Sequence, residues 1–139
     1  MKEIATYLTF DGTCAEAMKF YADCLGAELN LTSFADAKLE VPKEALNRTI
    51  HARLTKGAMA LMASDTMPGQ PHTAGNNFSV CVQCESQDEI ERLFAALGKN
   101  GKVGMPLQDT FWGAHFGTLT DQFGINWMFN FPKTPMPGA

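Results

Sequence analysis

The stretch TFWGAHFGTLTDQFGINWMFNF, residues 110–131, decides the fold, because it is strongly aromatic and predicts two strands around a tight turn. It contains both tryptophans, Trp112 and Trp127. Asp121 and Gly124 bound the predicted turn, and aromatic side chains favour strands on either side of it. This hairpin has more apolar surface than one sheet face needs. We therefore expect it to be covered by the rest of the chain, by a second copy or by a ligand.

The first half of the chain predicts a strand, a helix and then three strands. The helix is expected at 14–25, with Thr13 and Glu16 as a capping box and Gly26 as its left-handed C-terminal residue. A short strand at 7–10 precedes the helix. The three later strands, predicted from alternating or continuous apolar residues, lie at 27–34, 50–55 and 58–63.

The second half predicts the same elements in the same order. A strand at 78–84 precedes a helix that Ser86 and Glu89 would cap and that Gly98 would end. A short strand at 103–107 and the two strands of the aromatic hairpin follow. The repeat predicts an α+β protein, a single domain of two βαβββ modules, at about 1–66 and 76–131 with a Pro- and Gly-rich linker at 67–75.

Composition excludes several classes of protein. The net charge of −4 argues against a nucleic-acid surface, which needs an excess of Lys and Arg. No apolar leader and no run of about 20 apolar residues is present, so we expect no membrane segment and a cytoplasmic protein. The four cysteines are accordingly expected to be reduced thiols.

Several motifs carry a resemblance to a known family. They include YLTFDG at 7–12, TFW at 110–112 and TDQFGINW at 120–127. With the repeat, they resemble the vicinal oxygen chelate superfamily (the glyoxalase/bleomycin resistance/dioxygenase fold) and, within it, the PhnB-like branch, often labelled a demethylubiquinone methyltransferase-like domain. The resemblance implies curved mixed sheets around a cavity that binds a small molecule, and a homodimer. The modules would pair within one chain or across the dimer.

The superfamily's metal site transfers poorly to this sequence. By motif, its ligand positions fall at Thr6, His51, Asn77 and Met128, and His51 alone is an ordinary metal ligand. We therefore expect no metal and no cofactor. Methyl transfer has no independent support either, because the sequence lacks the glycine-rich strand-to-helix loop of a cofactor-binding fold.

The candidate ligand-binding residues are those that alternation or the resemblance places towards the cavity. His51 and Arg53 should point away from the helix, as an imidazole base and an anion clamp, or as structural hydrogen-bonding groups. Trp112 and His115 would line a pocket for a flat ligand, or Trp112 would belong to the core or a dimer contact. The complete set of cavity candidates is His51, Arg53, Ser79, Trp112, His115 and Met128.

Three functions remain open at this point. The first is a small-molecule-binding or resistance-type protein without the standard metal centre. The second is a metal-dependent lyase or dioxygenase-like enzyme built around His51, with or without His115. The third is a dimeric structural or regulatory protein without a ligand. No residue pattern in the sequence selects one of these three functions or names a substrate.

Overall fold

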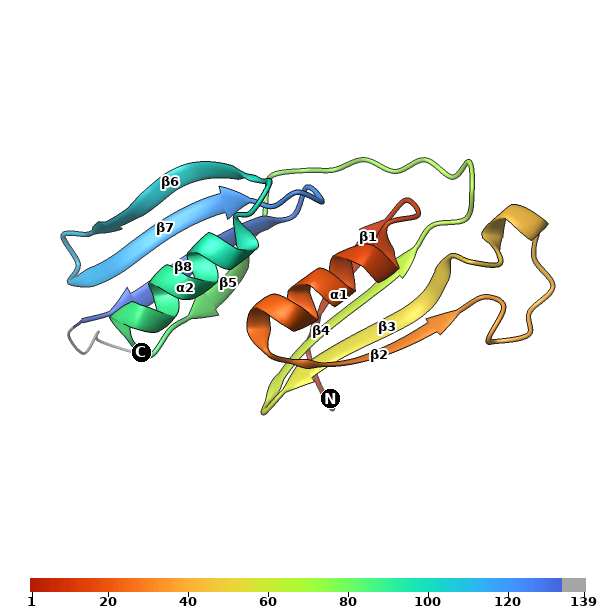
Figure 1. Ribbon diagram of the computed structural model, residues 1–139, viewed down its shortest axis with the longest axis horizontal. Coiled ribbons are helices and arrows are strands. Elements are labelled where there is room, and N and C mark those ends of the chain that lie inside the picture. Colours follow the sequence, from red (N-terminus) through yellow and green to blue (C-terminus); the bar gives the residue numbers. More distant parts are fainter. Residues whose placement is uncertain (134–139) are drawn as a thin grey trace. The chain divides into compact units, whose positions relative to one another are not determined.

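In the computed structural model, which describes residues 1–133, the chain divides into two compact units, Met1–Thr73 and Ala74–Ala139 (Figure 1). Each unit consists of one four-stranded sheet and one long helix. The two units repeat the same order of elements, strand, helix and three strands.

The first unit forms a mixed sheet with the strand order β1-β4-β3-β2. Strand β1 runs parallel to β4, and the other neighbours are antiparallel. Its elements are β1 (Thr6–Phe10), α1 (Cys14–Leu25), β2 (Glu28–Ser33), the 3₁₀ turn η1 (Lys43–Ala45), β3 (Thr49–Lys56) and β4 (Met59–Asp65).

The second unit repeats this topology, with the strand order β5-β8-β7-β6 and β5 parallel to β8. Its elements are β5 (Val80–Gln83), α2 (Gln87–Leu97), β6 (Lys102–Asp109), β7 (Ala114–Thr120) and β8 (Asn126–Pro132). The predicted α+β fold with two βαβββ repeats is therefore confirmed.

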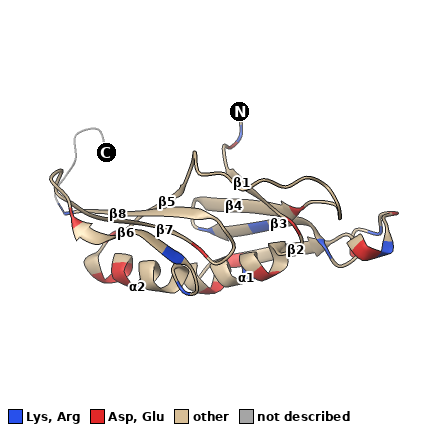
Figure 2. Cartoon of the chain, turned by 90° about the horizontal axis from the view of Figure 1, so that it is seen from above, with Lys and Arg blue, Asp and Glu red and all other residues tan. Residues whose placement is uncertain are grey.

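Each helix covers one face of its own sheet, and this side contains the core of the unit (Figure 2). In the first unit Leu8, Leu54 and Leu61 are buried on that face beside Tyr21 of α1. In the second unit the buried side chains include Trp127, Phe129, Leu119, Ile90 and Leu97. The opposite side of each sheet is called here its helix-free face. Because side chains alternate along a strand, the residues between the core positions lie on it.

The two helices begin differently, although the sequence predicts a capping box for both. Ser86 Oγ accepts a hydrogen bond from the Glu89 amide at 3.0 Å, as predicted. Thr13 makes no side-chain capping bond, so that part of the prediction is wrong. Asp65, at the end of β4, caps the helix in its place. Its carboxylate accepts a hydrogen bond from the Cys14 amide at 3.0 Å.

The start of the aromatic hairpin also differs from the prediction. Thr110 to Gly113 form a tight turn between β6 and β7, so Trp112 lies before the hairpin and not in its first strand. The Gly113 amide donates to the Thr110 carbonyl at 3.2 Å, and Gly113 has φ 83°, which a larger side chain disfavours. The fifth strand is likewise shorter than predicted, since it begins at Val80.

Neither α1 nor α2, nor any other helical segment within residues 1–133, is long and apolar enough to cross a membrane.

Candidate functional site

His51 lies on the helix-free face of the first sheet, as alternation in β3 predicts. Its neighbour Ala52 is fully buried, whereas His51 is exposed. The Nδ1 atom of His51 lies 3.3 Å from the hydroxyl of Tyr7 on β1, and the two ring centroids are 6.0 Å apart. An imidazole and a phenol therefore meet on an accessible surface, where both can hydrogen-bond to a ligand.

Arg53 lies two residues further along β3 on the same face. Its guanidinium holds the carboxylate of Glu3 in a fork, with Nη2–Oε1 at 2.8 Å and Nη1–Oε2 at 3.3 Å. Nη1 also contacts the sulfur of Met62 at 3.2 Å. The hydrogen bond from Arg53 lowers the pKa of Glu3, and the bond to Glu3 raises the pKa of Arg53. Arg53 thus already binds a carboxylate in two-point geometry.

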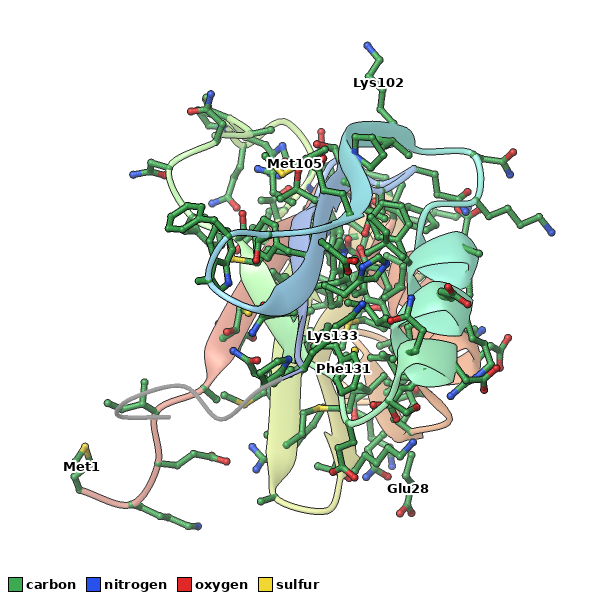
Figure 3. The ribbon with its side chains drawn as sticks, turned by 90° about the vertical axis from the view of Figure 1, so that its left-hand side faces the viewer. Met1, Glu28, Lys102, Met105, Phe131 and Lys133 are labelled. Atoms are coloured by element: carbon green, nitrogen blue, oxygen red, sulfur yellow. The ribbon has the colours of Figure 1, made fainter. Side chains whose placement is uncertain are left out.

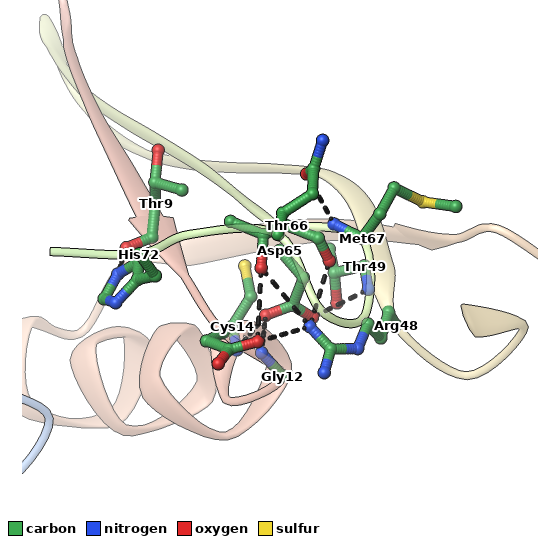
Figure 4. Close-up of polar contacts among 11 residues, drawn as sticks. Thr9, Gly12, Cys14, Arg48, Thr49, Asp65, Thr66, Met67 and His72 are labelled. Atoms are coloured by element: carbon green, nitrogen blue, oxygen red, sulfur yellow. Dashed lines mark hydrogen bonds and ion pairs between the residues drawn. The ribbon is translucent and has the colours of Figure 1, made fainter. Parts of the chain in front are cut away.

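A buried carboxylate fixes the scaffold of this unit (Figure 4). Asp65 Oδ1 accepts the amides of Gly12 at 2.8 Å and Cys14 at 3.0 Å, and Oδ2 accepts the Thr49 amide at 2.9 Å. These three bonds join the turn before α1 to the start of β3, which carries His51 and Arg53. Asp65 therefore acts on the position of this strand through backbone amides.

Arg48 adds further hydrogen bonds between the turn before α1 and the residue after β4. Its Nη1 donates to Asp11 Oδ1 at 2.8 Å and to the carbonyl of Thr66 at 3.0 Å. The hydrogen bond from Arg48 lowers the pKa of Asp11. Burial, together with the nearby charge of Asp65, raises the pKa of the Cys14 thiol to about 12, so this cysteine is an inert part of the core.

His115 lies on the helix-covered side of the second sheet. It is paired in register with Phe131, and the next residue on the same side, Gly117, is paired with the buried Phe129. Its Nδ1 lies 2.9 Å from Asp109 Oδ1, and Lys133, which follows β8, contacts the same oxygen at 2.7 Å. Figure 3 labels Lys133 together with Phe131 of β8. Hydrogen bonds from Lys133 and His115 lower the pKa of Asp109, and the bond from Lys133 has the larger effect.

The other three candidates of the second unit are Met128, Trp112 and Ser79. Met128 is on the helix-free face, between Cys81 and Thr118 in the register, so it and His115 lie on opposite sides of the sheet. Trp112 is 38% exposed, and its ring packs edge-on against Phe116 with centroids 5.7 Å apart. Ser79 is exposed and precedes β5.

The ligand positions transferred from the superfamily do not form a metal site. Thr6 is paired with the buried Leu61, which places it on the helix-covered side, whereas His51 is on the helix-free face. Asn77 lies outside any strand. Within residues 1–133 no group of three or more His, Cys, Asp or Glu side chains is placed to hold a metal ion. The residues present therefore do not fit the superfamily's metal.

Sequence reasoning missed two groups of residues on the helix-free faces. Tyr7 was detectable, because it alternates with the apolar Leu8 and Phe10 in β1. Glu3 precedes the strand, and no local pattern connects it with Arg53. On the second sheet, Asn130 and Gln83 join neighbouring strands through a 2.9 Å hydrogen bond from Asn130 Nδ2 to Gln83 Oε1.

The repeated modules and their sheet topology define a protein of the glyoxalase/bleomycin resistance/dioxygenase fold class. A glyoxalase/bleomycin resistance protein/dioxygenase family enzyme from Burkholderia phytofirmans superposes with a TM-score of 0.61 over 91% of this chain and 97% of its own. Its sequence identity is 14%, so it shows the fold alone.

Within that class, the chain belongs to the family described as 3-demethylubiquinone-9 3-methyltransferase, whose model matches residues 2–129. Protein YjdN of Escherichia coli K12 is 34% identical over 146 residues, covering 94% of this chain and 95% of that protein. The crystal structure of protein PA1353 from Pseudomonas aeruginosa has a TM-score of 0.84 at 40% identity, over 94% of this chain and 98% of that one. A PhnB protein from Bacillus cereus, described as a putative member of the same family, has a TM-score of 0.75 at 28% identity over 94% and 99%. The resemblance predicted from the motifs is confirmed.

Proposed function

We propose that this protein binds a small anionic molecule on the helix-free face of the first sheet, with Arg53 as the anion contact. The observation that supports this most directly is the fork between Arg53 and Glu3, with bonds of 2.8 and 3.3 Å. Two-point hydrogen bonding by a guanidinium suits carboxylate and phosphonate groups alike. Glu3 thus stands where the anionic group of a ligand would bind.

The surroundings of Arg53 suit a small ligand with an apolar or aromatic body. In the register, Met62 lies between Tyr7 on one side and Arg53 on the other. Two strand spacings separate Tyr7 from Arg53, or roughly 10 Å. The Met62 side chain would form the floor under the ligand, and the Tyr7–His51 pair would offer a hydrogen bond at its far end.

Isothermal titration calorimetry with phenylphosphonate tests this proposal. Arg53→Gln should weaken binding by about 10-fold or more, since a charge-assisted fork is lost. Glu3→Gln should strengthen binding severalfold, because the ligand no longer displaces a carboxylate. Lys43→Gln is the matched control, as it removes one exposed positive charge of the same unit and should leave the affinity unchanged.

Two results would overturn the proposal. One is the absence of measurable heat with phenylphosphonate and with a short panel of aromatic carboxylates. The other is an equal effect of the Arg53 and Lys43 variants, which would reduce the interaction to general electrostatic attraction. His51→Ala separates the two ends of the site, since it should weaken the aromatic ligands while methylphosphonate binds as before.

A second candidate function, a dimeric structural or regulatory protein, is favoured by exposed apolar side chains in the second unit. Phe111 is 98% exposed and Phe78 is 59% exposed. We propose that these exposed side chains contribute to a homodimer. Light scattering after gel filtration should then give twice the chain mass of 15.2 kDa. A species of the single-chain mass at high concentration would exclude the dimer.

The cytoplasm is the compartment that we propose. All four cysteines are free thiols, which persist in a reducing compartment. Fractionation of the source cells should recover the protein with cytoplasmic markers, and recovery with secreted proteins would contradict this.

A further inference from the structure

A carboxylate, an imidazole and an aromatic ring form one row across the second sheet. Asp109 on β6 is paired in register with His115 on β7, and His115 is paired with Phe131 on β8. Residues directly opposite one another in neighbouring strands point to the same face, so all three side chains lie on the helix-covered side. The row lies at the end of the sheet where β6 and β8 finish and β7 begins.

The carboxylate of Asp109 orients the ring of His115. Nδ1 of His115 lies 2.9 Å from Asp109 Oδ1. An ionised carboxylate only accepts hydrogen bonds, so Nδ1 carries the proton and Nε2 of the neutral ring has the free lone pair. Lys133 Nζ contacts the same oxygen at 2.7 Å. Hydrogen bonds from Lys133 and His115 lower the pKa of Asp109, which keeps this carboxylate ionised and fixed beside the ring.

The second ring nitrogen of His115 is free and reaches solvent. Nε2 makes no hydrogen bond with a described residue, and Asn130 Oδ1 is the one buried, unpartnered N or O atom of a side chain within residues 1–133. Nε2 therefore has accessible surface, although the side chain as a whole is 13% exposed. The other two histidines, His51 and His72, have no carboxylate among their hydrogen-bond partners.

We propose that His115 is a nucleophile towards small activated aryl esters, with Asp109 as its positioning residue. Nε2 bonds to the ester carbonyl carbon, the bond from that carbon to the aryl oxygen breaks, and the electron pair leaves with the aryl oxide. The Nδ1 proton stays on the ring, and the Asp109 carboxylate balances the positive charge of the acylated imidazole. Water then adds to the acyl carbon and the C–N bond breaks. The carboxylic acid leaves, and one proton passes to solvent, which restores the neutral ring.

The neighbours of His115 suit this chemistry. A carboxylate on Nδ1 fixes the tautomer that has its lone pair on Nε2 and stabilises the charge that develops on the ring. Phe131 is half-buried beside the ring and offers apolar surface to the aryl group of the ester. The site shares no residue with the proposed anion site around Arg53. Ester hydrolysis and phenylphosphonate binding can therefore fail separately.

Hydrolysis of p-nitrophenyl acetate, followed by the absorbance of p-nitrophenolate, tests the proposal. His115→Ala should lower the rate above the buffer background by about 10-fold or more. His72→Ala is the matched control and should leave the rate unchanged, since His72 is exposed and lacks a carboxylate partner. Exposure alone predicts the opposite order, because His115 is the half-buried one of the two. The assay thus separates the His115–Asp109 pair from the general reactivity of accessible histidines.

Asp109→Asn gives a second test at a position that is 68% exposed, where folding is less at risk. It should lower the rate severalfold and move the rise of the rate with pH to lower pH. The amide cannot stabilise the protonated imidazole, whereas Lys133 is present in both proteins. A purely structural role of Asp109 would leave this pH profile unchanged, and that result would overturn the proposal. So would equal rates for the wild-type protein and His115→Ala, or an equal loss in His115→Ala and His72→Ala.

Discussion

Replacing Asp65 with alanine tests whether one carboxylate positions the scaffold of the first unit. Asp65 is 8% exposed and accepts three backbone amides at 2.8 to 3.0 Å. The substitution leaves the amides of Gly12, Cys14 and Thr49 without their acceptor. Two of these belong to the start of α1 and the third to the start of β3, so both segments lose their attachment to the end of β4.

The expected cost follows from the kinds of bond lost. Each hydrogen bond to a charged group contributes about 1.5–3 kcal/mol, and loss of a helix cap costs about 0.5–2 kcal/mol. The sum of three such hydrogen bonds would overstate the loss of stability. Water enters the space left by the side chain, and folding no longer has to desolvate a buried charge. We expect Asp65→Ala to lower the free energy of unfolding by about 3–5 kcal/mol, at the upper end of single substitutions. Asp65→Asn keeps one acceptor oxygen and should cost about half as much.

Urea denaturation followed by circular dichroism measures this loss, and amide hydrogen exchange at Cys14 and Thr49 locates it. Asp23→Asn is the control, because Asp23 is an exposed carboxylate on the same helix and its loss should cost less than about 0.5 kcal/mol. A loss below about 1 kcal/mol for Asp65→Ala would refute the reasoning. So would unchanged exchange at both amides.

Three further outcomes are expected from local geometry. Ser86→Ala should cost about 1 kcal/mol in denaturant titration, whereas Thr13→Ala should cost clearly less, because only the serine makes a capping bond; equal losses would contradict this. Gly117→Ala should destabilise by about 1–3 kcal/mol, since the new Cβ would lie 2.9 Å from side-chain atoms of β6 and α2; a wild-type midpoint would refute the close contact. Thiol alkylation at pH 8, mapped by mass spectrometry, should modify Cys81, which is exposed, before Cys14, whose pKa is about 12; the reverse order would be inconsistent with this burial.

The fold could be predicted because its signals are local and occur twice. Helix 14–25 was located to the residue, since its apolar stripe and Gly26, with φ 62°, mark its end. Trp127, which alternates with Met128 along β8, is 1% exposed and belongs to the core. The capping residue of α1 was predicted wrongly for a physical reason. Its cap, Asp65, comes from a strand more than fifty residues away, and local sequence rules cannot detect such a bond.

The candidate site was less predictable for the same kind of reason. Alternation in β3 correctly placed Ala52 in the core with His51 on the other side. It could not show that the Arg53 guanidinium forms an ion pair with Glu3. His115 was expected on the cavity side with Trp112. The turn at 110–113 and the register of β7 instead place it on the helix-covered side, paired with Asp109. A strand that begins a few residues later than expected changes which neighbours its residues have.

The repeat explains why the proposed anion site lies on a helix-free face. On the helix-covered faces of both units, an apolar helix stripe packs on leucine or aromatic side chains of the sheet. Few substitutions can be accommodated there without loss of packing. The helix-free faces have diverged between the units. The first combines Tyr7 and His51 with the Arg53–Glu3 ion pair, whereas the second combines Asn130 with uncharged sulfur and aromatic groups. The duplicated scaffold therefore keeps the packing of its helix-covered faces, while the polar groups on its helix-free faces differ between the units. If the proposed anion site depends on the Arg53–Glu3 pair, substitutions on the helix-free face of the second sheet should leave the affinity for phenylphosphonate unchanged in calorimetry.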